Sequence, residues 1–471
     1  MPSALTKFRE WLTGGELLPV DRLLIGAPDG ALREAMSQGA PDAPLTLVHT
    51  GAAATEADAL RAAKGKAHAM LWGRIVDGGG LDGGVVFAAH PPRVARNGAM
   101  VDPFKTLEPL AVKFAPGASP RFLAQFLAGV AYYDLGRYHD ALRVLDNAAE
   151  PEAAYWRGLA HLMAGQDEEA FAAFNAVMDH TESLAQRGAL PALAFGNAAL
   201  ALRVIGARGD SEGAKEKLGQ AREMLSNFAA AIGDDPWYQA AAHYHAAGIL
   251  VELGGAAEES ARAALLREAM EQYEQALALV SLRSQPAAWA VIHRNLAATR
   301  RELASRVDDP AEAMALLKQS VRSLKKSAAA VTRQQWPADW AAAHDSLGDT
   351  YEEMARRAAA PREKLQYLAA AVGACRAALS ARDPNGYAPD WAATLNNLAS
   401  ALTSLATMVG GSHGAGLAQE ALRHYDQALT VFTETHFARY HQGVSANRAH
   451  AMILAARLAG EASSAGEIME T

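Results

Sequence analysis

Glycines, histidines and a single cysteine are the residues of this chain that could do chemistry, and their spacing sets the first limits on function. Gly26 and Gly30 follow the apolar run "DRLLIGAP" and precede the helical stretch "DGALREAMSQG", which is where a phosphate-binding loop would lie. The stretch lacks the third glycine of the dinucleotide pattern and the Gly-Lys-Ser/Thr of a P-loop. We expect a plain turn between a strand and a helix, with nucleotide binding as the alternative.

The other reactive side chains do not form a recognisable site. The spacings of His243 with His245 and of His436 with His441 point the two rings of each pair to different sides of a helix, and neither pair lies in an HExxH motif. The stretch "DGGGLDGG" has too few carboxylates for a calcium loop and is typical of a hairpin turn. Cys375 is expected to be a buried apolar side chain. We predict no cofactor, no metal and no enzyme activity.

Composition and charge restrict the class of partner. The 471 residues carry a formal net charge of -8, whereas nucleic acids and anionic membranes require a concentrated basic face. One basic cluster is expected to lie on the solvated side of a helix: Lys318, Arg322, Lys325 and Lys326. No apolar run reaches membrane-spanning length, and the first residues do not resemble a secretory signal. The sequence therefore predicts a cytoplasmic protein that binds neither nucleic acid nor membrane.

A tryptophan recurs at a constant interval in the second half of the chain. Trp289, Trp340 and Trp391 are 51 residues apart, and each is followed seven residues later by a leucine on the same helical face: Leu296, Leu347 and Leu398. A proline two or three residues before each tryptophan favours the start of a helix there: Pro286, Pro337 and Pro389. We interpret the tryptophan as a packing wedge repeated once per helical hairpin.

A shorter repeat precedes these units. In "QFLAGVAYYDLGRYHDALRVLDNAA", residues 125–149, small Gly129 and Ala141 are expected where two helices cross, and Gly136 where the first helix ends. With Tyr132 and Leu145 at their offsets, the stretch resembles a tetratricopeptide repeat (TPR). The resemblance covers roughly residues 120–460 and implies an α-solenoid of about seven hairpins. Because the later period exceeds the usual 34 residues, these units look like a long bacterial variety of the repeat.

The first 90 residues differ in pattern from the rest. Short apolar runs alternate with helical stretches and end in a hairpin, so the order β-α-β-α-β-β is predicted. The sequence thus predicts a mainly α protein: a small α/β domain over residues 1–90, a proline-rich surface linker over 91–119, and a TPR-like α-solenoid over 120–471.

The concave surface of such a solenoid is the predicted binding site. The residues expected to line it lie beside the Trp/Leu stripe of the first helices: Arg294, Arg301, Asp345, Asp349, Glu352, Asn396 and Ser400. We expect a non-catalytic scaffold or adaptor that binds a protein or peptide there. The alternative is a regulatory protein whose N-terminal domain senses a nucleotide or small ligand. Met452, Ile453 and Leu454 in the last helix could also join copies of the chain.

Overall fold

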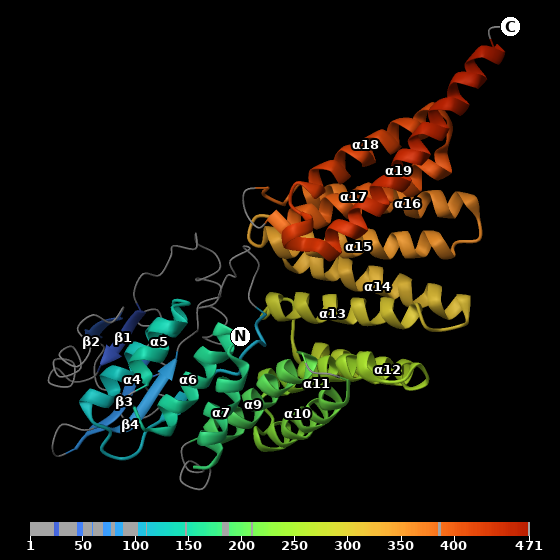
Figure 1. Ribbon diagram of the computed structural model, residues 1–471. Coiled ribbons are helices and arrows are strands. Elements are labelled where there is room, and N and C mark those ends of the chain that lie inside the picture. The colour runs from blue at the N-terminus through green and yellow to red at the C-terminus, as the bar shows by residue number, and fades with distance from the viewer. Residues whose placement is uncertain are drawn as a thin grey trace. The chain divides into compact units, whose positions relative to one another are not determined.

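The computed structural model describes residues 23–27, 45–49, 59, 69–76, 81–87, 102–109, 111–146, 148–180, 188–208, 211–384 and 388–469 (Figure 1). The chain divides into two compact units. Unit 1 comprises residues 1–93 and 103–258, and unit 2 comprises residues 94–102 and 259–471.

Unit 1 begins with a mixed five-stranded sheet in the order β2-β1-β3-β4-β5. The strands are β1 (Leu23–Ala27), β2 (Leu45–His49), β3 (Ala69–Ile75), β4 (Leu81–Phe87) and β5 (Ala111–Lys113). β1 runs parallel to both β2 and β3, whereas β3, β4 and β5 pair antiparallel. The four strands predicted within residues 1–90 are confirmed, and most of the residues between β1, β2 and β3 lie outside the described part of the chain.

Part of the glycine-rich stretch after β3, which the sequence predicted as a hairpin turn, belongs to strand β4. Gly83 and Gly84 lie inside β4, and a Cβ atom on either residue would overlap the backbone of the neighbouring strand. Glycine is therefore needed here for close strand approach. Gly26 is also a strand residue, paired with β2 and β3, whereas Gly30 lies outside the described residues.

One face of the sheet packs against helices α4 (Pro120–Asp134) and α6 (Pro151–Ala164). The Phe87 and Trp156 ring centroids are 5.6 Å apart, and Phe114 meets Phe122 and Phe126 edge to face. On the opposite face, Met70 and Val86 pack with Ala59. Because successive side chains of a strand point to opposite faces, the consecutive buried residues of β3 and β4 serve two hydrophobic layers.

Residues 103–118 do not form the surface linker that the sequence predicted. β5 lies within this stretch and closes the edge of the sheet beside β4. The side chains of Phe104, Leu107 and Phe114 are 0%, 0% and 1% exposed. The many prolines here prevent helix formation, but the apolar residues between them are part of the core.

The helices of unit 1 form consecutive pairs, α4 with α5, α6 with α7 and α9 with α10, followed by α11. The remaining bounds are α5 (Tyr138–Leu145), α7 (Asp167–Met178), α9 (Leu190–Arg208), α10 (Ser211–Ala231) and α11 (Pro236–Ala256). As predicted, Gly129 contacts Leu145 where α4 and α5 cross, and Gly136 follows α4 with a φ of 73°. Gly158 meets Phe174 in the same way in the next pair.

Helix α9 is long and apolar enough to cross a membrane by length and composition, contrary to the expectation that no such run exists. Within unit 1, however, 78% of its most apolar window is buried, and it packs against α7 and α10. Such burial is typical of the core helix of a globular unit.

The helices of unit 2 also pair, α13 with α14, α15 with α16 and α17 with α18, preceded by α12 and followed by α19 (Figure 1). The paired helices have 19 to 22 residues, about the length of α9 and α10. The bounds are α12 (Glu259–Leu279), α13 (Pro286–Ala304), α14 (Pro310–Ala330), α15 (Pro337–Arg357), α16 (Pro361–Leu379), α17 (Ala388–Val409), α18 (Gly411–Leu429) and α19 (Glu434–Met469).

The three tryptophans occupy equivalent places in unit 2. Trp289, Trp340 and Trp391 are each the fourth residue of a first helix, and each is partly buried. Lys326 lies over the Trp289 ring and Arg333 over the Trp340 ring, both 6.0 Å from the ring centroid. The tryptophan therefore recurs at the start of each long hairpin as predicted, and the leucines seven residues later are buried. That the ring acts as a packing wedge stays a prediction.

Helix α19 closes the last core of unit 2 with one face and leaves the other exposed. Leu454 packs against α18 and is 4% exposed, whereas Met452 and Ile453 are 51% and 67% exposed. Of the three apolar residues singled out in the sequence, two therefore form a surface patch.

Candidate functional site

The candidate site lies on the first helices of unit 2, α13, α15, α17 and α19, which contact one another directly in sequence order. Polar side chains join each helix to the next, and partners lie about one repeat apart in sequence. All seven residues predicted to line the groove are on these helices, and each is partly buried. We name this surface the inner face.

Two arginines of α13 pair with carboxylates of α15. An Arg294 guanidinium nitrogen lies 3.2 Å from an Asp339 oxygen, and Arg301 lies 3.2 Å from Asp349. Asp339 is almost fully buried, whereas the Arg301 and Asp349 side chains are 34% and 43% exposed. The first pair is structural, and the second is a half-exposed pair that a partner can reach.

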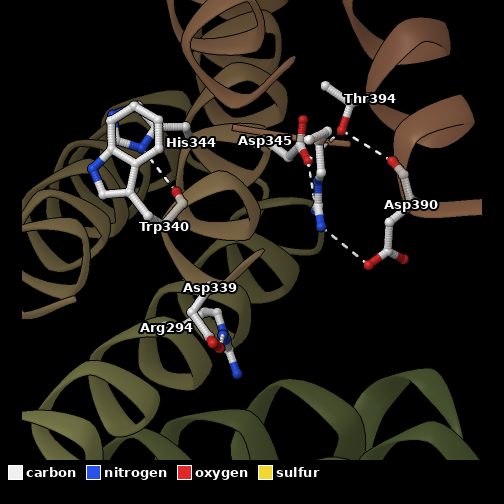
Figure 2. Close-up of polar contacts among 8 residues, drawn as sticks. Arg294, Asp339, Trp340, His344, Asp345, Asp390 and Thr394 are labelled. Atoms are coloured by element: carbon white, nitrogen blue, oxygen red, sulfur yellow. Dashed lines mark hydrogen bonds and ion pairs between the residues drawn. The ribbon is translucent and has the colours of Figure 1, made fainter. Parts of the chain in front are cut away.

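Asp345 is held by a polar cluster between α15 and α17 (Figure 2). Arg382, in the connection after α16, donates to Asp345 at 3.2 Å and to Asp390 at 3.0 Å. The Thr394 hydroxyl lies 2.8 Å from the same Asp345 oxygen. Because the Asp345 and Arg382 side chains are only 16% and 10% exposed, this cluster fixes α17 against α15.

Glu352, Ser400 and Asn396 complete the inner face. The Ser400 hydroxyl donates to both carboxylate oxygens of Glu352 at 3.3 Å. Asn447 of α19 donates to Asn396 at 3.4 Å. Unlike Asp345 and Asp349, Glu352 forms no ion pair in the described part of the chain, so its carboxylate is the least compensated of the three.

Burial raises the pKa of all three carboxyl groups of α15. The pKa of Asp345 rises to about 6 despite the Thr394 hydrogen bond and Arg382. The pKa of Glu352 rises to about 7, by burial and then by the charge of Asp349, while Ser400 opposes the shift. Burial also raises the pKa of Asp349 above its ordinary value, against the effect of Arg301. The α15 surface therefore carries negative charge that the protein itself stabilises poorly.

A recess of about 50 Å³ opens between α13, α14 and α15. Its walls include Arg294, Arg301, Ser346 and Thr350. Small-molecule sites typically enclose about 300–1,000 Å³, so this recess is suited to one side chain of a longer partner.

Sequence reasoning found the seven inner-face residues but missed the groups that hold them. Asp339, Arg382, Asp390 and Thr394 were not predicted, although Asp339 and Asp390 lie beside the marker tryptophans. The 51-residue spacing of these two aspartates was a usable signal. That the seven residues bind a partner stays a prediction.

Two other predictions concern single residues. Cys375 is buried as expected, with its sulfur where a Cβ of Gly348 would come within 2.5 Å. Burial raises the pKa of its thiol, so the thiolate is disfavoured. The nucleotide alternative at Gly26 and Gly30 stays a prediction, because the turn after β1 lies outside the described residues.

The consecutive hairpins, with small residues at the helix crossings, define a TPR-type repeat protein with a small α/β region at its start. No protein-family model matches the chain, and no curated protein matches it. Among solved structures, a thermophilic TPR protein of Thermus thermophilus is 21% identical with a TM-score of 0.29, over 44% of this chain and 97% of that chain.

Two further similar structures contain bound partners. The TPR2AB-domain:pHSP90 complex of yeast Sti1 is 15% identical with a TM-score of 0.22, over 70% of this chain and 97% of that chain. The human IFIT1 dimer with m7Gppp-AAAA is 17% identical with a TM-score of 0.34, over 72% of this chain and 68% of that chain. Because these TM-scores are below 0.5, those partners give no information about the partner of this chain.

Proposed function

We propose that this protein is a non-catalytic interaction scaffold that binds a cationic segment of a protein or peptide on the inner face of unit 2. The observation that carries the proposal is the carboxylate row on α15. Asp345, Asp349 and Glu352 follow one helical stripe, and Glu352 has a serine hydroxyl in place of an ion-pair partner. A lysine or arginine side chain supplies the missing positive charge.

The rigidity of the inner face supports recognition without rearrangement. The buried Asp345 cluster and the Arg294–Asp339 pair hold α13, α15 and α17 in register before a partner arrives. A preorganised surface avoids the ordering cost that a flexible receptor incurs on binding. The acidic row and the net charge of -8 also disfavour nucleic acid as the occupant.

The test uses charge-neutralising variants that keep the shape of the inner face. Asp349→Asn with Glu352→Gln removes two carboxylates, while the new amide oxygen in place of the Glu352 carboxylate can still accept from Ser400. A fluorescent peptide of alternating lysine and glycine is the probe, and anisotropy measures its binding to the full chain. The matched control, Glu271→Gln with Asp308→Asn, removes the same charge from exposed positions.

We expect the inner-face variant to weaken binding of the lysine peptide at least about five-fold at low salt, and the control to bind like the original chain. Equal affinity of all three proteins would mean that the inner face is not the binding site of the peptide. The original chain and the inner-face variant, used for crosslinked capture from the native cell, then identify natural partners whose binding depends on Asp349 and Glu352. Self-association through Met452 and Ile453 and a cytoplasmic location both stay predictions.

A further inference from the structure

The inner side of unit 1 is occupied by a short piece of the chain itself. Residues 104–108, "FKTLE", form no helix or strand, and they lie against the first helices of the hairpins. α4, α6, α9 and α11 each contribute one polar side chain to this piece: Tyr133, Tyr155, Asn197 and Tyr238. We name residues 104–108 the inner segment.

Asn197 recognises the backbone of the inner segment. Its side-chain oxygen accepts from the Leu107 N–H at 2.8 Å, and its side-chain nitrogen donates to the Leu107 carbonyl at 2.9 Å. The Tyr155 hydroxyl donates to the same carbonyl, and the Tyr238 hydroxyl donates to the Glu108 carbonyl at 2.7 Å. Contacts to N–H and C=O groups hold any sequence that adopts this backbone path.

Two side chains of the inner segment fill apolar pockets. The Phe104 ring centroid lies 4.8 Å from those of Trp237 and Tyr244, and the Phe104 carbonyl accepts from His245 Nε2 at 2.7 Å. Leu107 lies over Gly196, where an added Cβ would overlap its side chain. An aromatic side chain and a leucine three residues later are therefore the specific anchors.

Glu108 provides a third, polar anchor. Its Oε1 accepts from the Tyr133 hydroxyl at 2.7 Å and from the Thr106 hydroxyl at 2.9 Å. Lys105, in contrast, is exposed. The inner segment is thus held by hydrogen bonds to its backbone, by two apolar anchors and by one acidic anchor. A peptide bound in a recognition groove is held by the same kinds of contact.

We propose that unit 1 is a peptide-binding groove that holds its own inner segment as an internal ligand. A partner segment with an aromatic residue, leucine three positions later and then an acidic residue binds there by displacing residues 104–108. The inner segment is covalently tethered, so it competes at an effective concentration on the order of millimolar. Binding in trans is therefore weak until the internal copy is released.

The test supplies the inner segment in trans. The probe is a fluorescent peptide of residues 102–110, DPFKTLEPL, with a scrambled peptide of the same composition beside it. The full chain is compared with Phe104→Ala/Leu107→Ala, which removes both apolar anchors from the internal copy. Lys105→Ala is the matched control, because this exposed residue belongs to the same segment. Anisotropy gives the affinity, and thermal unfolding gives the stabilisation by peptide.

We expect the double variant to bind DPFKTLEPL at least about ten-fold more tightly than the original chain or Lys105→Ala. We also expect the peptide, but not its scrambled form, to raise the Tm of the double variant. Adding Asn197→Ala to the double variant should abolish both effects. If the double variant is unfolded alone, recovery of its helical circular dichroism with the peptide supports the proposal.

A double variant to which DPFKTLEPL neither binds nor gives stability or helicity beyond the scrambled peptide would overturn the proposal. In that case residues 104–108 would be an ordinary part of the core. The result is independent of the inner face of unit 2, because the lysine peptide and DPFKTLEPL probe different residues.

Discussion

The two units use the same first-helix surface in opposite ways. In unit 1, Asn197 and three tyrosines of this surface direct their polar atoms at the chain's own residues 104–108. In unit 2, the corresponding polar atoms pair from helix to helix and stay partly exposed, as Arg301 and Asp349 do. A hairpin array thus supplies a row of side chains, and the residue types decide whether the row recognises a backbone or presents charge.

One position makes the difference concrete. The residue after the crossing glycine is Asn197 in α9 and Asp349 in α15, following Gly196 and Gly348. An amide offers both a donor and an acceptor, which matches a peptide group, whereas a carboxylate only accepts and therefore attracts cations. The same place in the fold is a backbone clamp in one unit and part of an acidic row in the other.

The largest effect is expected when Asn197 and Asp349 are each truncated to alanine in separate variants. Asn197→Ala should lower the free energy of unfolding by about 2–4 kcal/mol, because it leaves the N–H and C=O of Leu107 buried with fewer partners. Asp349→Ala should change it by less than about 1 kcal/mol, because its ion pair with Arg301 is half-exposed and therefore screened by solvent. Urea unfolding measures both. A similar loss for the two variants would mean that the surfaces are not used differently.

Buried histidines sharpen the comparison further. His245 of unit 1 donates to the Phe104 carbonyl, whereas neither ring nitrogen of His293 in unit 2 has a hydrogen-bond partner among the described residues. His293→Leu places there the residue that the third long hairpin has at Leu395, so we expect a change within about 1 kcal/mol at pH 7. His245→Leu should cost about 1–3 kcal/mol. Urea unfolding at pH 7 compares the two variants, and an equal cost would contradict the difference in their hydrogen bonding.

The His293→Leu variant should also change how the free energy of unfolding depends on pH. Burial, with Lys326 and Arg300 nearby, lowers the His293 pKa to about 4 from 6.5. Between these values the unfolded chain binds a proton that the folded chain does not, so stability is lost as the pH falls from 6.5 towards 4. His293→Leu should make the acid branch of the stability curve shallower, and an unchanged branch would show that His293 does not titrate in this way.

The smallest expected effect concerns binding. Burial raises the pKa of Glu352 to about 7, so its carboxylate becomes mostly ionised between pH 6 and 8. The affinity for the lysine peptide should rise over this range by up to roughly ten-fold, since more of the protein then carries the negative charge. Glu352→Gln should flatten the dependence. A profile that keeps its slope in this variant would assign the titration to another group, such as Asp345.

Periodicity made the helical part predictable. Trp289, Trp340 and Trp391 set the long hairpins, Gly129 and Gly136 set the first short one, and these residues act through local geometry that sequence spacing reports. The seven inner-face residues followed from the same stripe. Their partners were harder to predict, because Arg382 reaches Asp345 from a connection whose path no periodic pattern describes.

The inner segment was missed for a different reason. Its flanking prolines, Pro103 and Pro109, indicated a linker, and proline does exclude a helix there. The signal lay elsewhere: Asn197 is an amide in the otherwise apolar stretch "PALAFGNAALAL", and a buried amide requires a hydrogen-bonding partner. Phe104 and Leu107, the apolar residues between the prolines, indicated that this segment could be buried and could supply the backbone groups that pair with Asn197.

One of the polar contacts of unit 2 that span one repeat involves a position that recurs with the repeat period. Arg294 pairs with Asp339, and Asp390 occupies the same place one period later. Excising residues 337–387 would therefore present α13 with another aspartate and another tryptophan at matching positions. Loss of one module would thus keep the aspartate beside Arg294, whereas Arg301 would face Ser400 in place of Asp349 and the Arg382 bridge would be removed. The array can therefore lengthen or shorten in evolution around a recurring contact, but each new junction needs some of its polar residues to change.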